Sequence, residues 1–329
     1  MSLQNRIAGP ALSRHNLQHF VRSYAVLILI VLLSLFLSAA SDSFLDPANL
    51  LNILNQNAPL LIVAAALTLV IIGGGFDLST GSIFAMAAVV SAWCAHDPVF
   101  LSLFGPNVCF IAGPLVGLAL GLINGVVITS LRVHSFLATL ATGLIFRSVA
   151  KQIAEGNSIT LFDLMPGIEW LGHGRIGPFT TAFLVMVAFC IIMGVVLNRT
   201  IYGRHLFAVG GNAEAAILAG IRPARVQITA FALTGLAAGL AGSIGLSRVL
   251  AAKATDGAGL EFDAIAAVIL GGTSIYGGAG AVWRSLAGVV LLALINNGFN
   301  ILQVDPFYKD LAKGLIIIFA VAMSATRRH

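Results

Sequence analysis

The sequence predicts an all-α protein that crosses a membrane many times, and three observations carry this prediction. Of its 329 residues, 58% are hydrophobic and only 9% are charged, whereas soluble globular domains carry about 25% charged residues. Long apolar runs recur along the chain, and one transmembrane helix needs about 20 apolar residues. The runs lack the regular polar alternation of strands in a membrane barrel. We therefore expect a polytopic helical bundle of about ten spans, some short or broken, in one transmembrane domain at residues 24–325.

The first apolar run, at residues 24–40, follows a basic leader at residues 1–23. It ends near Ala39-Ala40-Ser41, which imitates the cleavage site of a secretory signal. An integral membrane protein can use such a segment to start insertion, so we interpret it as a retained first span. The nine further apolar runs lie at 58–73, 81–96, 108–130, 134–153, 179–197, 226–247, 264–276, 285–302 and 309–325.

Two glycine-rich breaks interrupt these runs, one at 73–82 and one at 271–278. Non-helical backbone at membrane depth is tolerated only where protein buries it or a watery cavity solvates it. In transporters, matching broken segments in two halves of the chain mark the substrate route. A duplicated core, with 58–153 matching 226–325, would suit this pattern.

The distribution of basic residues predicts the orientation of the chain, because Lys and Arg accumulate in cytoplasmic loops. With the N-terminus inside, the cytoplasmic side receives most arginines, among them Arg132, Arg199, Arg204, Arg222 and Arg225. The other side receives fewer cations and most carboxylates. We therefore expect a bacterial inner-membrane protein with both termini cytoplasmic, including the tail 326–329. The net charge of +5 then marks a cytoplasmic face and predicts no nucleic-acid partner.

Small residues recur at helical spacing in two spans, as Gly113, Gly117, Gly121 and Gly125, and as Gly235, Gly239 and Gly242. Such stripes let helix backbones approach closely in lipid. We expect them to pack within one bundle, with a dimer seam as the alternative. The cysteines Cys94, Cys109 and Cys190 have no metal-ligand spacing. We expect them to pack as apolar side chains, with a Cys94–Cys109 pair as the alternative.

Asp77 lies in the first glycine-rich break, where an ionisable side chain is costly and usually functional. It could be a pathway or gating residue. Alternatively, Asp77 or Ser79 could cap the helix that begins near Gly81, because glycines on both sides suit a tight turn into a helix.

The segment 209–223, within a predicted coupling loop at 198–225, encodes a short exposed helix. Asn212 is a good N-cap, Glu214 falls in the first turn, and Gly220 can take a left-handed stop before Pro223. About two turns are too short to be stable alone. The helix therefore needs a partner surface; the alternative is that it lies on lipid headgroups.

Motifs for catalysis, metals and cofactors are missing from the sequence. No G-x-x-x-x-G-K-[ST] phosphate loop and no H-E-x-x-H pair occur, and the histidines are scattered. We therefore expect a chain that is not itself an enzyme and binds no cofactor, with any ATP bound by a partner.

Four ordered motifs resemble those of the ribose/xylose/arabinose-type ABC permeases, a family related more broadly to the branched-chain amino-acid ABC permeases. GGFDLSTGS at 74–82 is similar to that family's GGIDLSVGS, and GLING at 121–125 with FLATLAT at 136–142 is similar to GxxNG and FIxTLxT. GGNAEAAILAGI at 210–221 resembles GGNxxAAxxSGI, and EFDAIAAVILGGTS at 261–274 resembles ELxAIAAVVIGGTS. Phe76, Thr80, Ala219 and Trp283-Arg284 depart from the family pattern. Phe76 and Trp283 could reshape the cavity or fill lipid-facing space, so the substrate stays open.

The resemblance implies a permease for a monosaccharide or related polyol. It would work as a dimer with a second copy or a homologous permease, above ABC ATPase subunits and below a periplasmic sugar-binding protein. The resemblance also assigns the ATPase-coupling helix to Asn212, Glu214, Ala215, Ala216, Ile217, Gly220 and Ile221. Candidate substrate-pathway or gating residues are Phe76, Asp77, Ser79, Asn124, Thr139, Thr273 and Ser274.

Three other functions stay open at this point. One is a nucleoside or branched-chain amino-acid ABC permease of the same superfamily. Another is an ion-coupled secondary transporter, although such carriers typically hold coupling carboxylates inside their spans, where Asp77 is the one candidate. A membrane-embedded enzyme would need a nucleophile and a base on facing spans, and the sequence offers no such pair.

Overall fold

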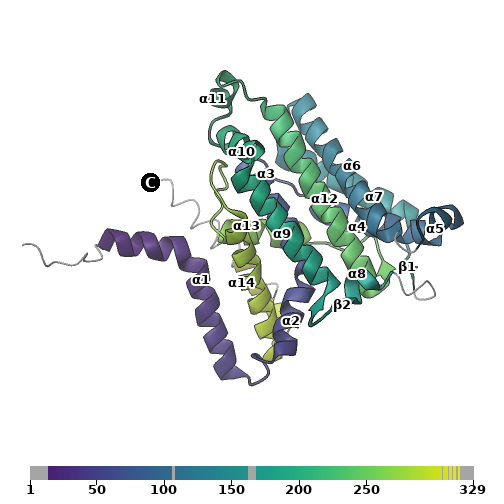
Figure 1. Cartoon of the computed structure of the whole chain (residues 1–329), viewed down its shortest axis with the longest axis horizontal. Coiled ribbons are helices and arrows are strands. Elements are labelled where there is room, and N and C mark those ends of the chain that lie inside the picture. The colour runs from purple at the N-terminus through teal and green to yellow at the C-terminus, as the bar shows by residue number, and fades with distance from the viewer. Residues whose placement is uncertain are drawn as a thin grey trace, which may run out of the picture.

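The described part of the chain is a bundle of helices with two very short strand pairs (Figure 1). The computed structural model describes residues 14–105, 108–161, 168–305, 307–309, 311–312, 314–315 and 318. The side chains of residues 14–23 and of Cys109 are outside this description. The helices are α1 (Arg14–Ala40), α2 (Pro47–Gln56), α3 (Ala58–Ile72), α4 (Thr80–His96), α5 (Pro98–Phe104), α6 (Val108–Leu131), α7 (Ser135–Ile153), α8 (Trp170–His173), α9 (Thr181–Arg199), α10 (Ile201–Gly211), α11 (Ala213–Leu218), α12 (Pro223–Val249), α13 (Leu260–Leu270) and α14 (Val282–Ile301). Strand β1 (Ile159–Thr160) pairs antiparallel with β4 (Ala251–Ala252), and β2 (Arg175–Ile176) pairs antiparallel with β3 (Phe179–Thr180).

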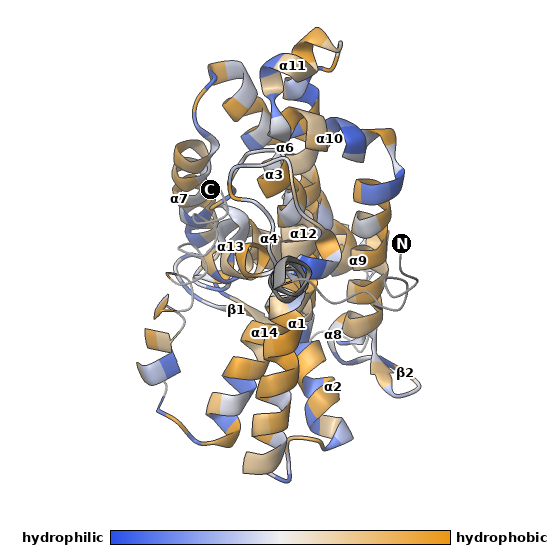
Figure 2. Cartoon of the chain, turned by 90° about the vertical axis from the view of Figure 1, so that its left-hand side faces the viewer, coloured by the Kyte–Doolittle hydropathy of each residue, from blue (hydrophilic) through white to orange (hydrophobic). Residues whose placement is uncertain are grey.

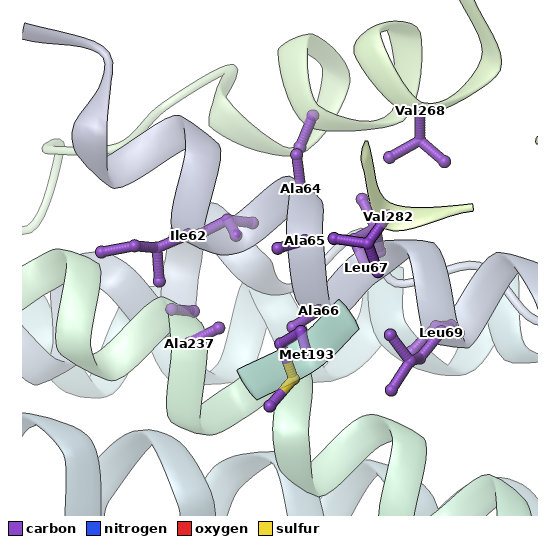
Figure 3. Packing of buried hydrophobic residues seen from close by; sticks show 14 of the residues in the cluster. Ile62, Ala64, Ala65, Ala66, Leu67, Leu69, Met193, Ala237, Val268 and Val282 are labelled. Carbon is purple, nitrogen blue, oxygen red and sulfur yellow. The ribbon is translucent and has the colours of Figure 1, made fainter. Parts of the chain in front are cut away.

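Helix α3 is the centre of the bundle. Almost all its residues are buried, so it is apolar on every side, as expected for a helix surrounded by protein. Figure 3 shows its side chains beside residues of four neighbouring helices, Met193 of α9, Ala237 of α12, Val268 of α13 and Val282 of α14. The other helices therefore pack around one buried, predominantly apolar helix.

The glycine stripes of α6 and α12 face each other except at Gly242, which lies against Phe84 of α4. A side chain on Gly117 would overlap the carbonyl oxygen of Gly235 and lie 2.7 Å from the Cα atom of Gly239. A side chain on Gly239 would likewise overlap the carbonyl oxygen of Gly113. This seam joins two helices of one chain, which confirms the prediction that the stripes pack within the bundle.

Nine of the ten predicted apolar runs coincide with helices, and the tenth, at 309–325, lies largely outside the described residues. By length and composition, four of the described helices can cross a membrane, namely α6 from Phe110, α9, α12 and α14. Two bent pairs, α2 with α3 at 49° and α4 with α5 at 90°, raise the number to six. In Figure 2 the helices of the bundle are predominantly orange, the colour of hydrophobic residues. The chain is thus a polytopic all-α membrane protein.

Helix α12 defines two ends of the molecule, because its 27 residues span about 40 Å. At its first residue lie α10 and α11, and we name this the α11 end. At its last residue lie α2 and the β1–β4 pair, and we name this the opposite end (Figure 1). Arg204, Arg222 and Arg225 lie at the α11 end, whereas Lys151, Arg248 and Lys253 lie at the opposite end. These six cations, three from each predicted set, therefore lie at opposite ends of the bundle.

Two local predictions have structural outcomes. The helix that was expected to begin at Tyr24 begins at Arg14, so the second half of the leader is helical. Cys94 and Cys190 are buried free thiols, which fits apolar packing. The tail 326–329, which was predicted to be cytoplasmic, lies outside the described residues.

Candidate functional site

The first helix break turns the chain from α3 into α4 in seven residues. The amide groups of Gly73, Gly74 and Gly75 donate to carbonyls of the last turn of α3 at 2.9–3.0 Å, which closes the helix. Gly74 has φ +81°, a left-handed conformation that a side chain disfavours. The turn therefore depends on glycine at this position.

A fully buried polar cluster follows this turn. One carboxylate oxygen of Asp77 accepts hydrogen bonds from the backbone amide of Ser79 at 2.9 Å and from its hydroxyl at 2.5 Å. The side-chain amide of Asn124, on α6, donates to the Ser79 hydroxyl at 2.7 Å. Asp77, Ser79 and Asn124 are all 0% exposed. The cluster thus braces the break against α6.

Helix α7 holds the same break from the other side. The backbone amide of Phe76 donates to the hydroxyl of Ser135 at 2.9 Å, and that of Leu78 donates to the hydroxyl of Thr139 at 3.0 Å. Thr139 in turn donates to the carbonyl of Ser135 at 2.8 Å. These side chains satisfy backbone groups that a non-helical segment leaves free, as membrane-embedded loops require.

A second carboxylate lies at the start of α4. A side chain on Gly81 would overlap Oε2 of Glu261, from the first turn of α13, so glycine is needed for this approach. A carboxylate beside a helix N-terminus is stabilised by the free amide groups there. The second oxygen of Asp77, the amide oxygen of Asn124 and Oε2 of Glu261 have no hydrogen-bond partner among the described residues.

The second helix break, residues 271–281, separates α13 from α14. Its Thr273 is buried, and its hydroxyl lies 3.4 Å from that of Ser285 on α14. Ser285 accepts a hydrogen bond from Thr68 of α3 at 2.8 Å. The backbone amide of Ser274 donates to the carbonyl of Ala279, which closes the loop on itself at 2.9 Å.

The two breaks meet at what we name the glycine junction, formed by Gly74, Gly210, Gly277 and Gly278. The amide of Gly278 donates to the carbonyl of Ile72, the last residue of α3, at 2.8 Å. A side chain on Gly210, near the end of α10, would overlap that carbonyl and lie 2.7 Å from the amide nitrogen of Gly278. A side chain on Gly277 would lie 3.1 Å from Gly74. Both breaks therefore touch the helix that leads directly into α11.

Helix α11 has the ends that the sequence predicts. The side chain of Asn212 accepts a hydrogen bond from the amide of Ala215 at 2.9 Å. Gly220 has φ +81°, its amide donates to Ile217, and the amide of Ile221 donates to Ala216. This pair of bonds is the Schellman motif, which satisfies the last carbonyls of a helix. Helix α10 was not predicted from the sequence as a separate helix, and neither was its contact with the breaks.

The apolar side chains of α11 point away from the bundle. Ile217 is 58% exposed and Leu218 is 90% exposed, whereas Ala216 is buried. Glu214 is also exposed. This short helix thus presents two large apolar groups and one carboxylate at the tip of the α11 end (Figure 1).

The seven candidate pathway residues fall into two groups. Phe76, Asp77, Ser79, Asn124 and Thr139 lie together at the first break, and Thr273 and Ser274 lie in the second. None of them lines the cavities of 350–380 Å³ described among residues 49–57, 74–75, 128–135, 186–198, 224–231 and 282–301. Their geometry is that of braces around the breaks, and contact with a substrate stays a prediction.

Comparison with known proteins gives the family. A profile described as "Branched-chain amino acid transport system / permease component" matches residues 49–321. The chain is 38% identical over 292 residues to the ribose import permease protein RbsC of Bacillus subtilis (strain 168), with 89% of each chain covered. It is 34% identical to the D-allose transport system permease protein AlsC of Escherichia coli (strain K12), over 90% of this chain and 89% of that one.

A third relative is the galactose/methyl galactoside import permease protein MglC of Haemophilus influenzae. It is 31% identical to this chain, with 96% of this chain and 98% of the relative covered. No solved structure matches the chain. With a profile that covers most of its length and relatives above 30% identity, this chain belongs to the branched-chain amino acid transport system / permease component family.

Proposed function

We propose that this chain is the membrane-spanning permease of an ABC importer that moves a monosaccharide or related polyol across the bacterial inner membrane. The chain itself hydrolyses no ATP, since it lacks a phosphate-binding loop, and a separate ATPase subunit supplies the energy. Its relatives are named for the import of ribose, allose and galactose, which supports a monosaccharide as substrate.

The proposed transport mechanism rests on one observation: the exposed helix α11 is connected to both helix breaks through the glycine junction. ATP binding draws two ATPase subunits together, and a helix seated in one of them moves with it. Because Gly210 packs directly on Ile72 and Gly278, a displacement of α10 and α11 reaches the ends of α3 and the loop before α14. The bundle then rocks between states open to either side.

Within this mechanism, the coupling helix and its ends consist of Asn212, Glu214, Ala215, Ala216, Ile217, Gly220 and Ile221. Ala216 is buried and anchors the helix to the bundle. The turn that bends during gating is held by Phe76, Asp77 and Ser79 of the first break, with Asn124 of α6 and Thr139 of α7. Thr273 and Ser274 do the same for the second break.

The partners follow from the same proposal. The α11 end faces the cytoplasm and an ABC ATPase, with both termini on that side, and the opposite end faces a periplasmic sugar-binding protein. About ten membrane-embedded segments, with α13 as a half-length one, form one half of a permease dimer. The second half is another copy or a homologous permease.

The family description supports a second candidate, a branched-chain amino acid as substrate. An amino-acid zwitterion is expected to meet charged groups or helix ends at its site. Uptake of L-leucine beside D-ribose, D-allose and D-galactose by the reconstituted complex separates the two candidates.

The coupling assignment is tested by Glu214→Arg, which reverses the charge at the start of α11. The complex of permease, ATPase and binding protein is assayed for ATP hydrolysis stimulated by the loaded binding protein. We expect Glu214→Arg to lower this stimulation at least severalfold. Glu214→Asp, which keeps the negative charge at the start of α11, is the matched control and leaves it unchanged. Equal stimulation in both variants would refute the role of α11.

A further inference from the structure

A cavity of about 380 Å³ lies at the opposite end, between α2 and the last turns of α14. This volume falls in the range of small-molecule sites, roughly 300–1,000 Å³. Its lining includes seven side-chain amides and no charged residue: Asn49, Asn52, Gln56, Asn57, Asn296, Asn297 and Asn300. We name it the amide cavity. Figure 2 places α2 and α14 side by side at the end of the molecule farthest from α11.

The amides come from one face of each helix. Asn49, Asn52 and Gln56 are spaced three and four residues apart on α2, and Asn296 and Asn300 are four residues apart on α14. Residues at these spacings lie one above the other along a helix. Amide groups are costly to place in hydrocarbon without partners, so these two faces require water or a polar ligand rather than lipid.

The cavity is held in shape by groups outside it. Arg248, at the end of α12, donates to the carbonyls of Asn55 and Gln56 at 3.2 and 3.3 Å. Thr180 donates to the side chain of Asn55 at 2.5 Å. These bonds fix the 49° bend between α2 and α3, which turns Gln56 and Asn57 toward α14. The cavity is therefore preformed.

The amides satisfy one another only in part. Asn49 and Asn297 exchange hydrogen bonds across the two helices, at 2.9 and 3.4 Å, and Gln56 donates to Asn52 at 3.0 Å. An amide offers two donors and an acceptor with two lone pairs, so each keeps unused capacity. Among the described residues, the side chain of Asn296 has no hydrogen-bond partner, although it is half-buried.

From this arrangement we infer that the amide cavity is the outer substrate subsite of the permease and that its ligand is a neutral, polyhydroxylated solute. A sugar hydroxyl both donates and accepts, and a neutral amide does the same, so the two match without a net charge. Lys309 donates to the side-chain oxygen of Asn300 at 2.5 Å, so a cation borders the cavity. No carboxylate lines it, so the ammonium group of a zwitterion would stay unpaired there. The inference rests on the proposed function, because it gives the outer end of the transport route a site and a substrate class.

Kinetics of uptake test the site. The complete complex is reconstituted with its ATPase and binding protein, and uptake of D-ribose, D-allose and D-galactose is measured. The variant is Asn296→Leu, which keeps the volume of the side chain but removes its capacity for hydrogen bonds. We expect KM for the transported sugar to rise about tenfold, because one or two hydrogen bonds to the ligand are lost. Asn296→Gln, which retains an amide, recovers most of the affinity. Gln152→Leu, an exposed amide outside the cavity, is the control and leaves KM unchanged.

A second measurement applies if Asn296→Leu fails to fold. Asn296→Cys, in a Cys109→Ser background, is labelled in intact membranes by a membrane-impermeant maleimide added from the outer side. Protection from labelling by the transported sugar, but not by L-leucine, supports the subsite. KM for Asn296→Leu within twofold of the wild type, or labelling that the sugar does not slow, overturns it. Wild-type complex that takes up no sugar refutes instead the proposed function, so the two failures are distinct.

Discussion

The packing at the glycine junction predicts different effects of alanine at two adjacent positions of α10, Gly210 and Gly211. The Cβ atom of an alanine at 210 would overlap the carbonyl oxygen of Ile72 and lie 2.7 Å from the amide nitrogen of Gly278, against 3.4–4 Å for ordinary contacts. The neighbouring segments must therefore separate by roughly 0.7 Å or more, which strains the hydrogen bond between Ile72 and Gly278. Overpacking costs about 1–3 kcal/mol and a weakened hydrogen bond about 0.5–1.5 kcal/mol. We expect Gly210→Ala to lose about 2–4 kcal/mol of stability.

The matched control is Gly211→Ala, because a side chain on Gly211 has no atom within 4 Å. Alanine there is neutral or stabilises the end of α10 by up to about 1 kcal/mol. Both variants are compared with the wild type by thermal unfolding of the purified permease and by ATP hydrolysis that depends on the loaded binding protein. Gly210→Ala should lower the unfolding temperature and the coupling, and Gly211→Ala should change neither substantially. Equal behaviour of the two variants would refute the junction.

Three further predictions concern the seam, the first break and the coupling helix. Gly117→Ala should destabilise the purified permease by about 1–3 kcal/mol in thermal unfolding, because the added Cβ atom overlaps the backbone of α12. The control Gly194→Ala, which adds a Cβ atom in open space, should not; the reverse order would contradict the close packing of α6 on α12. Asp77→Ala should cost about 1–3 kcal/mol, since it leaves the buried amide and hydroxyl of Ser79 without their acceptor, and an unchanged unfolding temperature would argue against the brace. Asn212→Ala should cost α11 about 0.5–2 kcal/mol of cap energy, seen as faster hydrogen exchange in that helix alone; unchanged exchange would mean that the cap is dispensable.

The parts of the fold that the sequence predicted best are those set by local chemistry. The N-cap at Asn212 and the left-handed stop at Gly220 act within a few residues, and both formed where predicted. The glycine stripe on α6 is equally local in pattern, since four-residue spacing alone places glycines on one face of a helix. Its partner stripe on α12 was visible in the sequence for the same reason.

Tertiary contacts were not predictable in this way. Nothing near Gly210 in the sequence reveals that its Cα atom packs against Ile72, about 140 residues earlier, or against Gly278. Asp77 carried two open interpretations, because a helix cap and a pathway residue have the same sequence signature. The structure shows that Asp77 is fully buried, because Asn124 and Thr139 pack around the same break.

Two features that were not predicted have local signals in the sequence. Asp46 followed by Pro47 is a helix start, and the side chain of Asp46 does accept a hydrogen bond from Ala48, yet α2 was missing from the predicted layout. The amides of α2 recur at helical spacing, which is an unusual pattern in so apolar a chain. Their meeting with the amides of α14 depended on the fold.

The central claim is that this permease supplies a route and a separate ATPase supplies the energy through α11. Sugar accumulation in proteoliposomes tests it most directly, with the permease reconstituted either alone or with its ATPase and binding protein. Accumulation against a gradient should require the ATPase, ATP on its side of the membrane and the loaded binding protein. Uphill accumulation by the permease alone, driven by a proton or sodium gradient, would contradict the account.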